Sequence, residues 1–285
     1  MRFGWVFNLD AELELALPSY NPKLSVLSQL AQYGGGSRAL LGPEDIELGP
    51  ETRATASLIG RAWCPTRRAL AAFAAAGIEP EPHPSLAVLR RVNHRRFAHE
   101  LGGGLPEQHY VDERGAVEAL LARPGQWMLK RPLTLAGRGQ LRAFRELSVK
   151  EWTWVDASLA HDGLIVEPLV LPTLELSQHG FVWPSGAYEL GRACVQEVTP
   201  RGVFRGIRLA ASELSADEAR ALRDTSERVA LALTNAGYFG PFGVDAYRYE
   251  RDGESGFCAL GEINARYTMG FAVGFPRPAH ELSLA

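Results

Sequence analysis

The feature that most constrains the fold is a pair of alternating apolar and polar runs joined by an Asp-Gly turn, in residues 243–265 (GVDAYRYERDGESGFCALGEINA). Alternation of this kind predicts two half-buried β-strands, and Asp-Gly between them is a strong hairpin signal. If the loop centres between Gly253 and Glu254, Asp245 lies directly opposite Glu262. The sequence therefore predicts two carboxylates on one face of a hairpin.

These carboxylates suggest a metal site. Like charges directly opposite each other destabilise a hairpin, so the pair of Asp245 and Glu262 calls for a cation between them. In residues 261–270 (GEINARYTMG) the side chains of Glu262, Asn264 and Arg266 alternate with apolar ones and share a face. Asp245, Glu262 and Asn264 resemble a partial oxygen cage for Mg2+ that leaves positions open for phosphate oxygens or water. The alternative is a half-exposed strand whose polar residues face water.

Composition narrows the class of ligand. The chain has 285 residues, 46% of them hydrophobic, which suffices for two or three subdomains, and its net charge of -3 gives no basic footprint for nucleic acid. No apolar run approaches the length that spans a bilayer, and MRFGWVF at the N-terminus reads as a strand rather than a signal peptide. The odd count of cysteines (Cys64, Cys194 and Cys258) argues against a disulfide framework. We therefore expect a cytoplasmic protein with a small or nucleotide ligand, and no nucleic-acid or membrane partner.

Several elements follow from local patterns. The first ninety residues alternate short apolar runs with helical patterns, which is typical of an α/β layer with a parallel sheet, and the proline-rich EPEPHP predicts a boundary near residue 90. Farther along, we expect a short helix in NHRRFAHEL, a helix around AVEALLA and strands in QWMLK, ELSQHGFVW, AYELGRACVQEV and GVFRGIRLA. A helix from about Ala216 to Asn235 begins with Ser215 and Glu218 in capping-box spacing and ends before Gly237. It should cover a sheet.

A second polar group follows the strand QWMLK. Lys130 at the strand end can act as a point charge on phosphate, and Gly137 and Gly139 flank Arg138 in a loop whose amides can approach oxygens closely. The alternative is a surface hairpin with a snorkelling lysine.

In their order, VNHRRF, MLKRP with AGRG, LIVEPLVLPTLE, GPFGVDAY and GEINAR resemble the motifs of the ATP-grasp superfamily, over residues 92–270. The resemblance implies a mixed α/β and α+β fold. An N-terminal α/β domain (1–91) would precede a central subdomain (92–168) and a C-terminal subdomain (169–285) that carries the metal site. The two subdomains, both α+β, would clamp ATP between them.

The resemblance also implies roles for residues. The nucleotide-binding set would be Arg95, Lys130, Gly137, Arg138, Gly139, Glu167, Leu169, Val170 and Glu175. Within it, AGRG would be a mobile loop over the phosphates, the amide of Leu169 would meet the adenine edge and Glu175 would bind the ribose. Asp245, Glu262 and Asn264 match the magnesium ligands. Arg95 departs from the pattern, because the family usually has a lysine there, and arginine is a planar fork rather than a point charge.

Catalytic and substrate-binding groups are less sharply defined. Arg266 matches an arginine that often faces the acyl phosphate, and Lys130 would stabilise charge beside it. Arg205 and Arg208 are three apart and so face opposite sides of an ideal strand; we choose Arg208 as the partner of a carboxylate or phosphate. The N-terminal segment NLDAELE adds Asn8, Asp10 and Glu12 as candidates near a strand end.

The activity implied by the resemblance is ATP-dependent carboxylate–amine ligation. With Mg2+, ATP would phosphorylate a carboxylate of a small molecule or peptide, and an amine would then displace phosphate from the acyl phosphate. Two alternatives remain: an ATP-grasp phosphotransferase that stops at a phosphorylated product, and a nucleotide-binding protein without catalysis. The identity of the substrates is open, and so is the assembly, for which a homodimer is one option.

Overall fold

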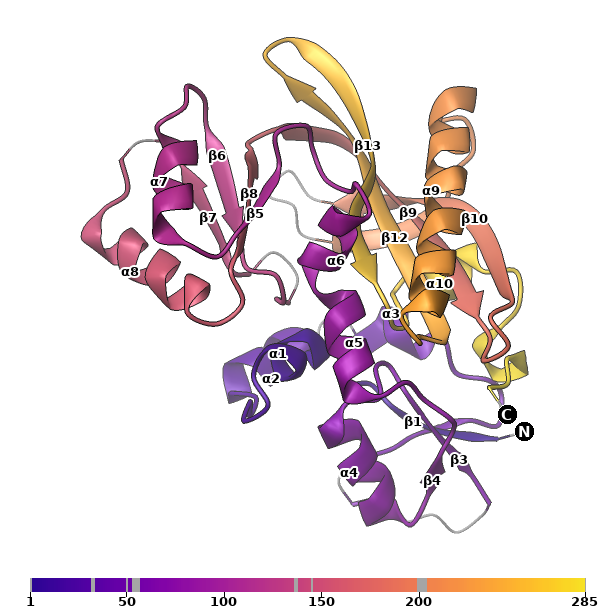
Figure 1. Cartoon of the computed structure of the whole chain (residues 1–285). Coiled ribbons are helices and arrows are strands. Elements are labelled where there is room, and N and C mark those ends of the chain that lie inside the picture. The colour runs from indigo at the N-terminus through magenta and orange to yellow at the C-terminus, as the bar shows by residue number, and fades with distance from the viewer. Residues whose placement is uncertain are drawn as a thin grey trace.

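Three sheets and the helices against them form three lobes (Figure 1) in the computed structural model, which describes residues 2–31, 34–49, 51–52, 57–135, 138–144, 146–198 and 204–284. The N-terminal lobe lies at the bottom of Figure 1, the central lobe at the upper left and the C-terminal lobe at the right.

The N-terminal lobe contains the predicted parallel sheet. Its strand order is β2-β1-β3-β4, and all three pairings are parallel. Its elements are β1 (Phe3–Val6), α1 (Ala11–Ala16), α2 (Leu24–Ala31), α3 (Gly34–Arg38), β2 (Ile46–Glu47), β3 (Ile59–Ala62), α4 (Arg67–Ala76) and β4 (Glu79–Pro80). The α/β alternation of the first ninety residues is thus confirmed.

Two consecutive helices, α5 (Leu86–Asn93) and α6 (Arg95–Glu100), lead from the N-terminal lobe toward the other two (Figure 1). Ser85 caps α5 by accepting a hydrogen bond from the amide of Val88, so this helix begins before the boundary expected near residue 90. His94 ends α5 and caps α6, because its ring accepts from the amide of Arg96.

The central lobe is a four-stranded antiparallel sheet in the order β5-β8-β6-β7, with two helices. Its elements are β5 (His109–Val111), α7 (Arg114–Leu121), β6 (Trp127–Lys130), β7 (Gln140–Ala143), α8 (Val149–Leu159) and β8 (Leu164–Pro168). Sequence reasoning missed α8. The signal was present, since Ser148 and Glu151 form a complete capping box at its start.

The C-terminal lobe is a five-stranded antiparallel sheet in the order β11-β10-β9-β12-β13. Its elements are β9 (Leu171–Val182), β10 (Tyr188–Val198), β11 (Phe204–Leu209), α9 (Ala216–Asn235), β12 (Gly240–Arg251), β13 (Glu254–Asn264), α10 (Phe271–Gly274) and a 3-10 turn (Ala279–Glu281). Helix α9 has its predicted bounds and its Ser215–Glu218 capping box, and its buried side chains, such as Leu222 and Val229, pack in the core with this sheet.

The predicted hairpin is β12 and β13, and Asp245 does lie opposite Glu262. The turn is not where the sequence predicted it. It falls one residue earlier, at Asp252 and Gly253, which both have positive φ. A bulge then shifts the register between Asp245 and Tyr247, so that the two carboxylates still face each other.

The lobes do not share one core. Side chains of the N-terminal lobe, such as Trp5, pack in a single cluster with the C-terminal sheet and α9, including Phe242 and Leu233. The central lobe has a separate core around Leu129 and Val166. A cavity between the central and C-terminal lobes therefore lies between two independently packed bodies.

Candidate functional site

A cavity of about 470 Å3 lies between the central sheet and the C-terminal sheet. Sequence-predicted residues that line it are Arg95, Lys130, Glu167, Leu169, Val170, Glu175, Asp245 and Glu262. Arg95 comes from helix α6 and Lys130 from strand β6. The others come from β8, β9, β12, β13 and the β8–β9 junction. The fold thus brings most of the predicted set to one place.

The central sheet provides one wall through alternate residues of β6 and β8. Met128 pairs with Glu167, and Lys130 pairs with Ile165, so these four side chains share a face. All four line the cavity. Lys130 forms an ion pair with the buried Glu167, so the predicted phosphate-binding cation already has a partner from the same wall.

The short connection from β8 to β9 forms one edge of the cavity. The amide of Leu169 donates to the carbonyl of Gln126 at 2.8 Å, which leaves no N–H at Leu169 for a ligand and counts against its predicted contact with adenine. Pro168 has no N–H to donate. Among the described residues, nothing accepts a backbone hydrogen bond from Val170, whose amide is the better candidate for this edge.

The C-terminal sheet provides the opposite wall. Asp245 accepts from Gln196 Nε2 at 3.1 Å and from Asn264 Nδ2 at 2.9 Å, and Glu262 lies opposite it in the hairpin. Glu175 pairs with Tyr247, two residues beyond Asp245, and therefore lies on the same face of the sheet.

Burial shifts the protonation of these acids. The pKa of Asp245 is raised to about 7, first because the carboxylate is desolvated and second because Glu262 places a like charge opposite it. The hydrogen bond from Asn264 acts in the other direction but is the smaller effect. Desolvation also raises the pKa of Glu175. A bound cation would offset the repulsion that raises the pKa of Asp245.

Arg95 spans the cavity and contacts Glu262, one of the two carboxylates predicted to bind a metal ion. Its Nη2 donates to Glu262 Oε2 at 2.8 Å, while its Nη1 donates to the carbonyl of Arg131 at 2.7 Å and to Thr134 Oγ1 at 3.1 Å. The arginine that stands where the family usually has a lysine is thus held on a carboxylate rather than left for phosphate.

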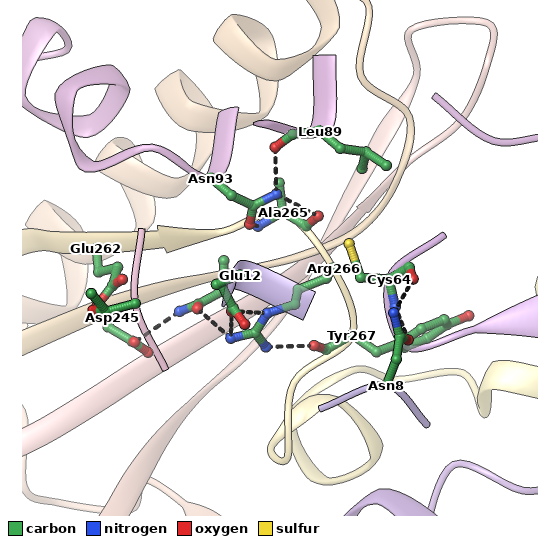
Figure 2. A network of polar contacts seen from close by, with 12 residues as sticks. Asn8, Glu12, Cys64, Leu89, Asn93, Asp245, Glu262, Ala265, Arg266 and Tyr267 are labelled. Atoms are coloured by element: carbon green, nitrogen blue, oxygen red, sulfur yellow. Dashed lines mark hydrogen bonds and ion pairs between the residues drawn. The ribbon is translucent and has the colours of Figure 1, made fainter. Parts of the chain in front are cut away.

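Arg266 is not an open cation either. Figure 2 shows it beside Glu12 of α1 and Tyr267: it forms an ion pair with Glu12 and donates to the carbonyl of Tyr267 at 2.9 Å. It also donates to Asn264 Oδ1 at 3.0 Å. Asn264 in turn donates to Asp245. Arg266 therefore connects the N-terminal lobe to the carboxylate pair through the amide of Asn264.

Three predicted nucleotide-binding residues belong to the AGRG loop. Arg138 and Gly139 line a separate cavity of about 280 Å3, beside Tyr20 and α8, instead of the cavity that contains Lys130. Gly137 lies outside the described residues.

Arg208 lies away from the cavity. It pairs with Val195, and Val195 with Leu176, so it shares the strand face of the buried core and not the face of Asp245. Its guanidinium forms ion pairs with Glu213 at 2.6 Å and Glu197 at 3.4 Å, and its side chain is about half exposed. The geometry therefore disfavours Arg208 as a catalytic group.

The N-terminal candidates divide into two kinds. Asn8 hydrogen-bonds the backbone of Cys64 in both directions, and Asp10 forms an ion pair with Arg68 at 2.8 Å, so both hold the lobe together. Of the three, only Glu12 is linked to the Asp245–Glu262 pair, because it forms an ion pair with Arg266. Its Oε2 is buried and has no hydrogen-bond partner among the described residues.

Sequence reasoning missed several cavity residues. Met128 and Ile165 are apolar, and Gln196 and Tyr247 lie on strands read only for their alternation. The signal for Tyr247 was available, since it lies two residues from Asp245 on a strand and must share its face. Gln196 belongs to another hairpin and gave no local signal.

The donor set fits a hard cation. Asp245 and Glu262 provide opposed carboxylates, which are oxygen donors that Mg2+ accepts. The predicted third ligand, Asn264, turns its Nδ2 toward Asp245, and its Oδ1 accepts from Arg266, so its amide oxygen is not open to a cation. Within the described ranges, no three His, Cys, Asp or Glu side chains form a metal-binding group, so the protein would supply two carboxylates and leave other positions to phosphate and water.

Comparison with known proteins gives structural neighbours only. No protein-family profile and no curated protein matches the chain. Pyruvate carboxylase from Rhizobium etli is 18% identical with a TM-score of 0.57, over 88% of this chain and 21% of its own. Biotin carboxylase from Campylobacter jejuni, in its β-γ-ATP complex, is 13% identical with a TM-score of 0.56, over 79% of this chain and 56% of its own.

D-alanyl-alanine synthetase A from Vibrio cholerae matches along nearly the whole length. It is 13% identical with a TM-score of 0.53, over 99% of this chain and 90% of its own. The chain thus spans only a fifth of the pyruvate carboxylase and just over half of the biotin carboxylase, but most of the synthetase. At these identities the likeness establishes the fold. Separately, no helix in the described part of the chain is long and apolar enough to cross a bilayer.

Proposed function

The chain has the ATP-grasp fold, and we propose that it is an ATP-dependent ligase that activates a carboxylate as an acyl phosphate and joins it to an amine. The observation that carries this proposal is the cavity between two separately packed lobes, which is lined by two cationic side chains, Lys130 and Arg95, and by the opposed carboxylates of Asp245 and Glu262. Phosphoryl transfer needs positioning and charge stabilisation more than a side-chain nucleophile, and these are what the cavity offers.

The nucleotide would lie with its base against the central sheet. Met128 and Ile165 offer an apolar surface, and the Val170 amide offers a donor at the edge. Glu175, on the facing strand β9, lines the same cavity and would bind the ribose hydroxyls. Lys130 would exchange its ion pair with Glu167 for the phosphates, and an ammonium group suits this role because it binds phosphate as a point charge.

The carboxylate pair would hold Mg2+, which when bound neutralises phosphate charge and orients the γ-phosphate. Asp245 and Glu262 are the direct candidates as ligands. Asn264 would keep Asp245 in place by donating from its Nδ2, and the Asn264 oxygen accepts from Arg266. Since Arg266 is paired with Glu12, the N-terminal lobe would help to fix the position of Asp245. In this arrangement Arg266 acts first as a positioning residue.

The structural neighbours support the reaction class. Biotin carboxylase was seen in complex with a form of ATP, and D-alanyl-alanine synthetase is named for joining two amino acids. The second neighbour also has nearly the length of this chain, which favours amino acids or short peptides as carboxylate and amine.

The test is a screen of amino acids and short peptides in pairs, with ADP and phosphate release measured and the products identified by mass. A ligase releases ADP only when a carboxylate and an amine are both present. ADP with a single acceptor indicates the phosphotransferase instead, and nucleotide binding with no ADP in any pair indicates a non-catalytic protein. Either of those results would contradict the proposal.

Two variants make the screen specific to this site. Glu262→Gln should abolish metal-dependent turnover, and Lys130→Met should reduce it by about a hundredfold, since removal of one charge-stabilising group commonly has that effect. Arg223→Gln is the control, because Arg223 forms an ion pair with Glu227 on the surface of α9, away from the cavity. Full turnover in a folded Glu262→Gln protein would remove the carboxylate pair from the mechanism.

A further inference from the structure

Arg95 holds three segments of the molecule with one guanidinium. It begins helix α6, and its side chain is 11% exposed. Nη2 contacts Glu262 of β13, and Nη1 contacts the carbonyl of Arg131 and the hydroxyl of Thr134, both in the segment after β6. A lysine could not make these contacts together, because its single ammonium lacks the planar fork of arginine.

The contact with Glu262 has a direct consequence for cation binding. Glu262 faces Asp245 across the hairpin, so two acidic side chains lie opposite each other. The guanidinium supplies a fixed positive charge at 2.8 Å from Glu262 Oε2. A divalent cation that used this oxygen would have to displace Arg95 or bind close to its charge, and both cost free energy.

We propose that Arg95 is a placeholder cation that keeps Glu262 from a divalent metal until a polyphosphate takes over the guanidinium. The inference rests on the proposed function for the identity of the site, and goes beyond it by assigning an order: the metal enters with the nucleotide and not before it. Phosphate oxygens can accept the same two-pronged hydrogen bonds that Glu262 and the Arg131 carbonyl now accept.

The same exchange reaches the loop that follows β6. When the guanidinium turns to phosphate, Arg131 and Thr134 lose their hydrogen bonds to Nη1, while the hydrogen bond from the Arg95 amide to the Pro132 carbonyl, at 3.2 Å, does not depend on the side chain. Thr134 would then be free to adjust, while Pro132 stays attached to the Arg95 amide and Arg131 stays held by its own hydrogen bonds to the Gly139 carbonyl and Ser158 Oγ. Metal binding and loop position are thereby coupled through one side chain.

The experiment measures Mn2+ binding to the nucleotide-free protein, by the paramagnetic resonance signal of unbound Mn2+. The wild type should bind Mn2+ weakly. Arg95→Met should bind it at least about tenfold more tightly, because removing one member of a close charge pair leaves the other available. Arg96→Met is the matched control: Arg96 is the next residue along α6 and pairs with Glu100 on the surface, so its loss should change nothing.

A double variant identifies the site that is gained. Adding Glu262→Gln to Arg95→Met should abolish the new affinity, whereas Glu262→Gln alone should leave the weak wild-type binding unchanged. If Arg95→Met does not fold, Arg95→Lys, which loses the fork, should give a smaller gain in the same direction.

The outcomes separate this inference from the proposed function. Equal Mn2+ affinity of the wild type and the folded Arg95 variants overturns the placeholder role, and so does a gain that survives Glu262→Gln. A labelled non-hydrolysable ATP analogue is added in a parallel equilibrium dialysis. If the analogue binds and the Mn2+ gain is absent, only the placeholder fails; if the analogue does not bind, the proposed function fails.

Discussion

At the residue scale, the surroundings of Asp245 decide the protonation state of its carboxylate. A half-buried carboxylate with another acid opposite is disfavoured in its charged form, and the two amide donors from Gln196 and Asn264 reduce the penalty without removing it. Such an arrangement is unfavourable for stability and useful for binding a cation. Stability and function should therefore respond in opposite directions when Asp245 is neutralised.

Asp245→Asn tests this opposition through pH. The pKa of Asp245 is raised to about 7 in the folded chain and lies near 4 in the unfolded chain, so the folded state holds the extra proton between these values. Stability of the wild type should consequently fall as pH rises from about 4 to about 7, in the proportion set by proton linkage.

The variant lacks this loss. Because Asp245 is only partly shielded on the cavity side, we expect the variant to gain about 1–2 kcal/mol on the wild type between pH 4 and pH 8, and to lose metal-dependent turnover. Urea unfolding without metal at the two pH values measures the difference. A difference that stays constant with pH would mean that Asp245 is not the perturbed group.

At the element scale, the bulge in the β12–β13 hairpin decides whether the carboxylates meet. The turn at Asp252 and Gly253 would by itself place Asp245 opposite residue 260, and the two additional residues of β13 between the paired positions bring Glu262 there instead. Gly261 lies in this bulge, with the ring of Tyr247 and the carbonyl of Asp245 close to the place where a Cβ would be. A glycine is needed because of this close approach.

Gly261→Ala should disturb that register. The added Cβ would lie 2.7 Å from Tyr247 Cε1 and 3.3 Å from the Asp245 carbonyl, so the strand or the ring must shift. We expect a loss of about 1–3 kcal/mol in unfolding free energy, as for other overpacked sites, and weaker metal binding in the protein that remains folded. Gly115→Ala, in helix α7 where a Cβ meets no atom within 4 Å, is the control and should be neutral or stabilising. Normal Mn2+ binding by folded Gly261→Ala would show that the register tolerates the change.

At the scale of the whole molecule, the N-terminal and C-terminal lobes behave as one packed body and the central lobe as another. Arg61 is a principal link within the first body. Its side chain is fully buried, stacks on Phe3 at 3.6 Å, forms a two-pronged ion pair with Glu81 and donates to the carbonyls of Ala279 and Leu282. It thereby holds the last described residues against the first strand, as the adjacent chain ends in Figure 1 show.

Arg61→Met should destabilise the protein strongly. Removing the guanidinium leaves Glu81, whose pKa is already raised by desolvation, without its charge partner, and a broken buried pair typically costs about 3–5 kcal/mol. Unfolding of the N-terminal and C-terminal lobes should occur at lower denaturant concentration. Combining Arg61→Met with Glu81→Leu should recover part of the loss, because no unpaired charge remains. Failure of the second change to recover any stability would assign the effect to the lost carbonyl contacts instead.

The sequence by itself determined the features that depend on neighbouring residues. Period-two alternation and the Asp-Gly turn placed the hairpin, the capping box placed α9 with its bounds, and the α/β rhythm placed a parallel sheet at the start. The motif order led to the ATP-grasp fold that the structural neighbours bear out. Helix α8 was equally local and was missed although its capping box was visible.

Only the tertiary structure decided which partner each polar group takes. Arg95 meets Glu262 across 167 positions of chain, Arg266 meets Glu12 across 254, and the Leu169 amide is taken by the Gln126 carbonyl. The face of Arg208 likewise follows from how β11 pairs with β10. Local patterns fix the direction in which a side chain points along its own element, but a charged group is satisfied by whichever opposite charge packing brings within hydrogen-bond reach, and that depends on how distant elements fit together.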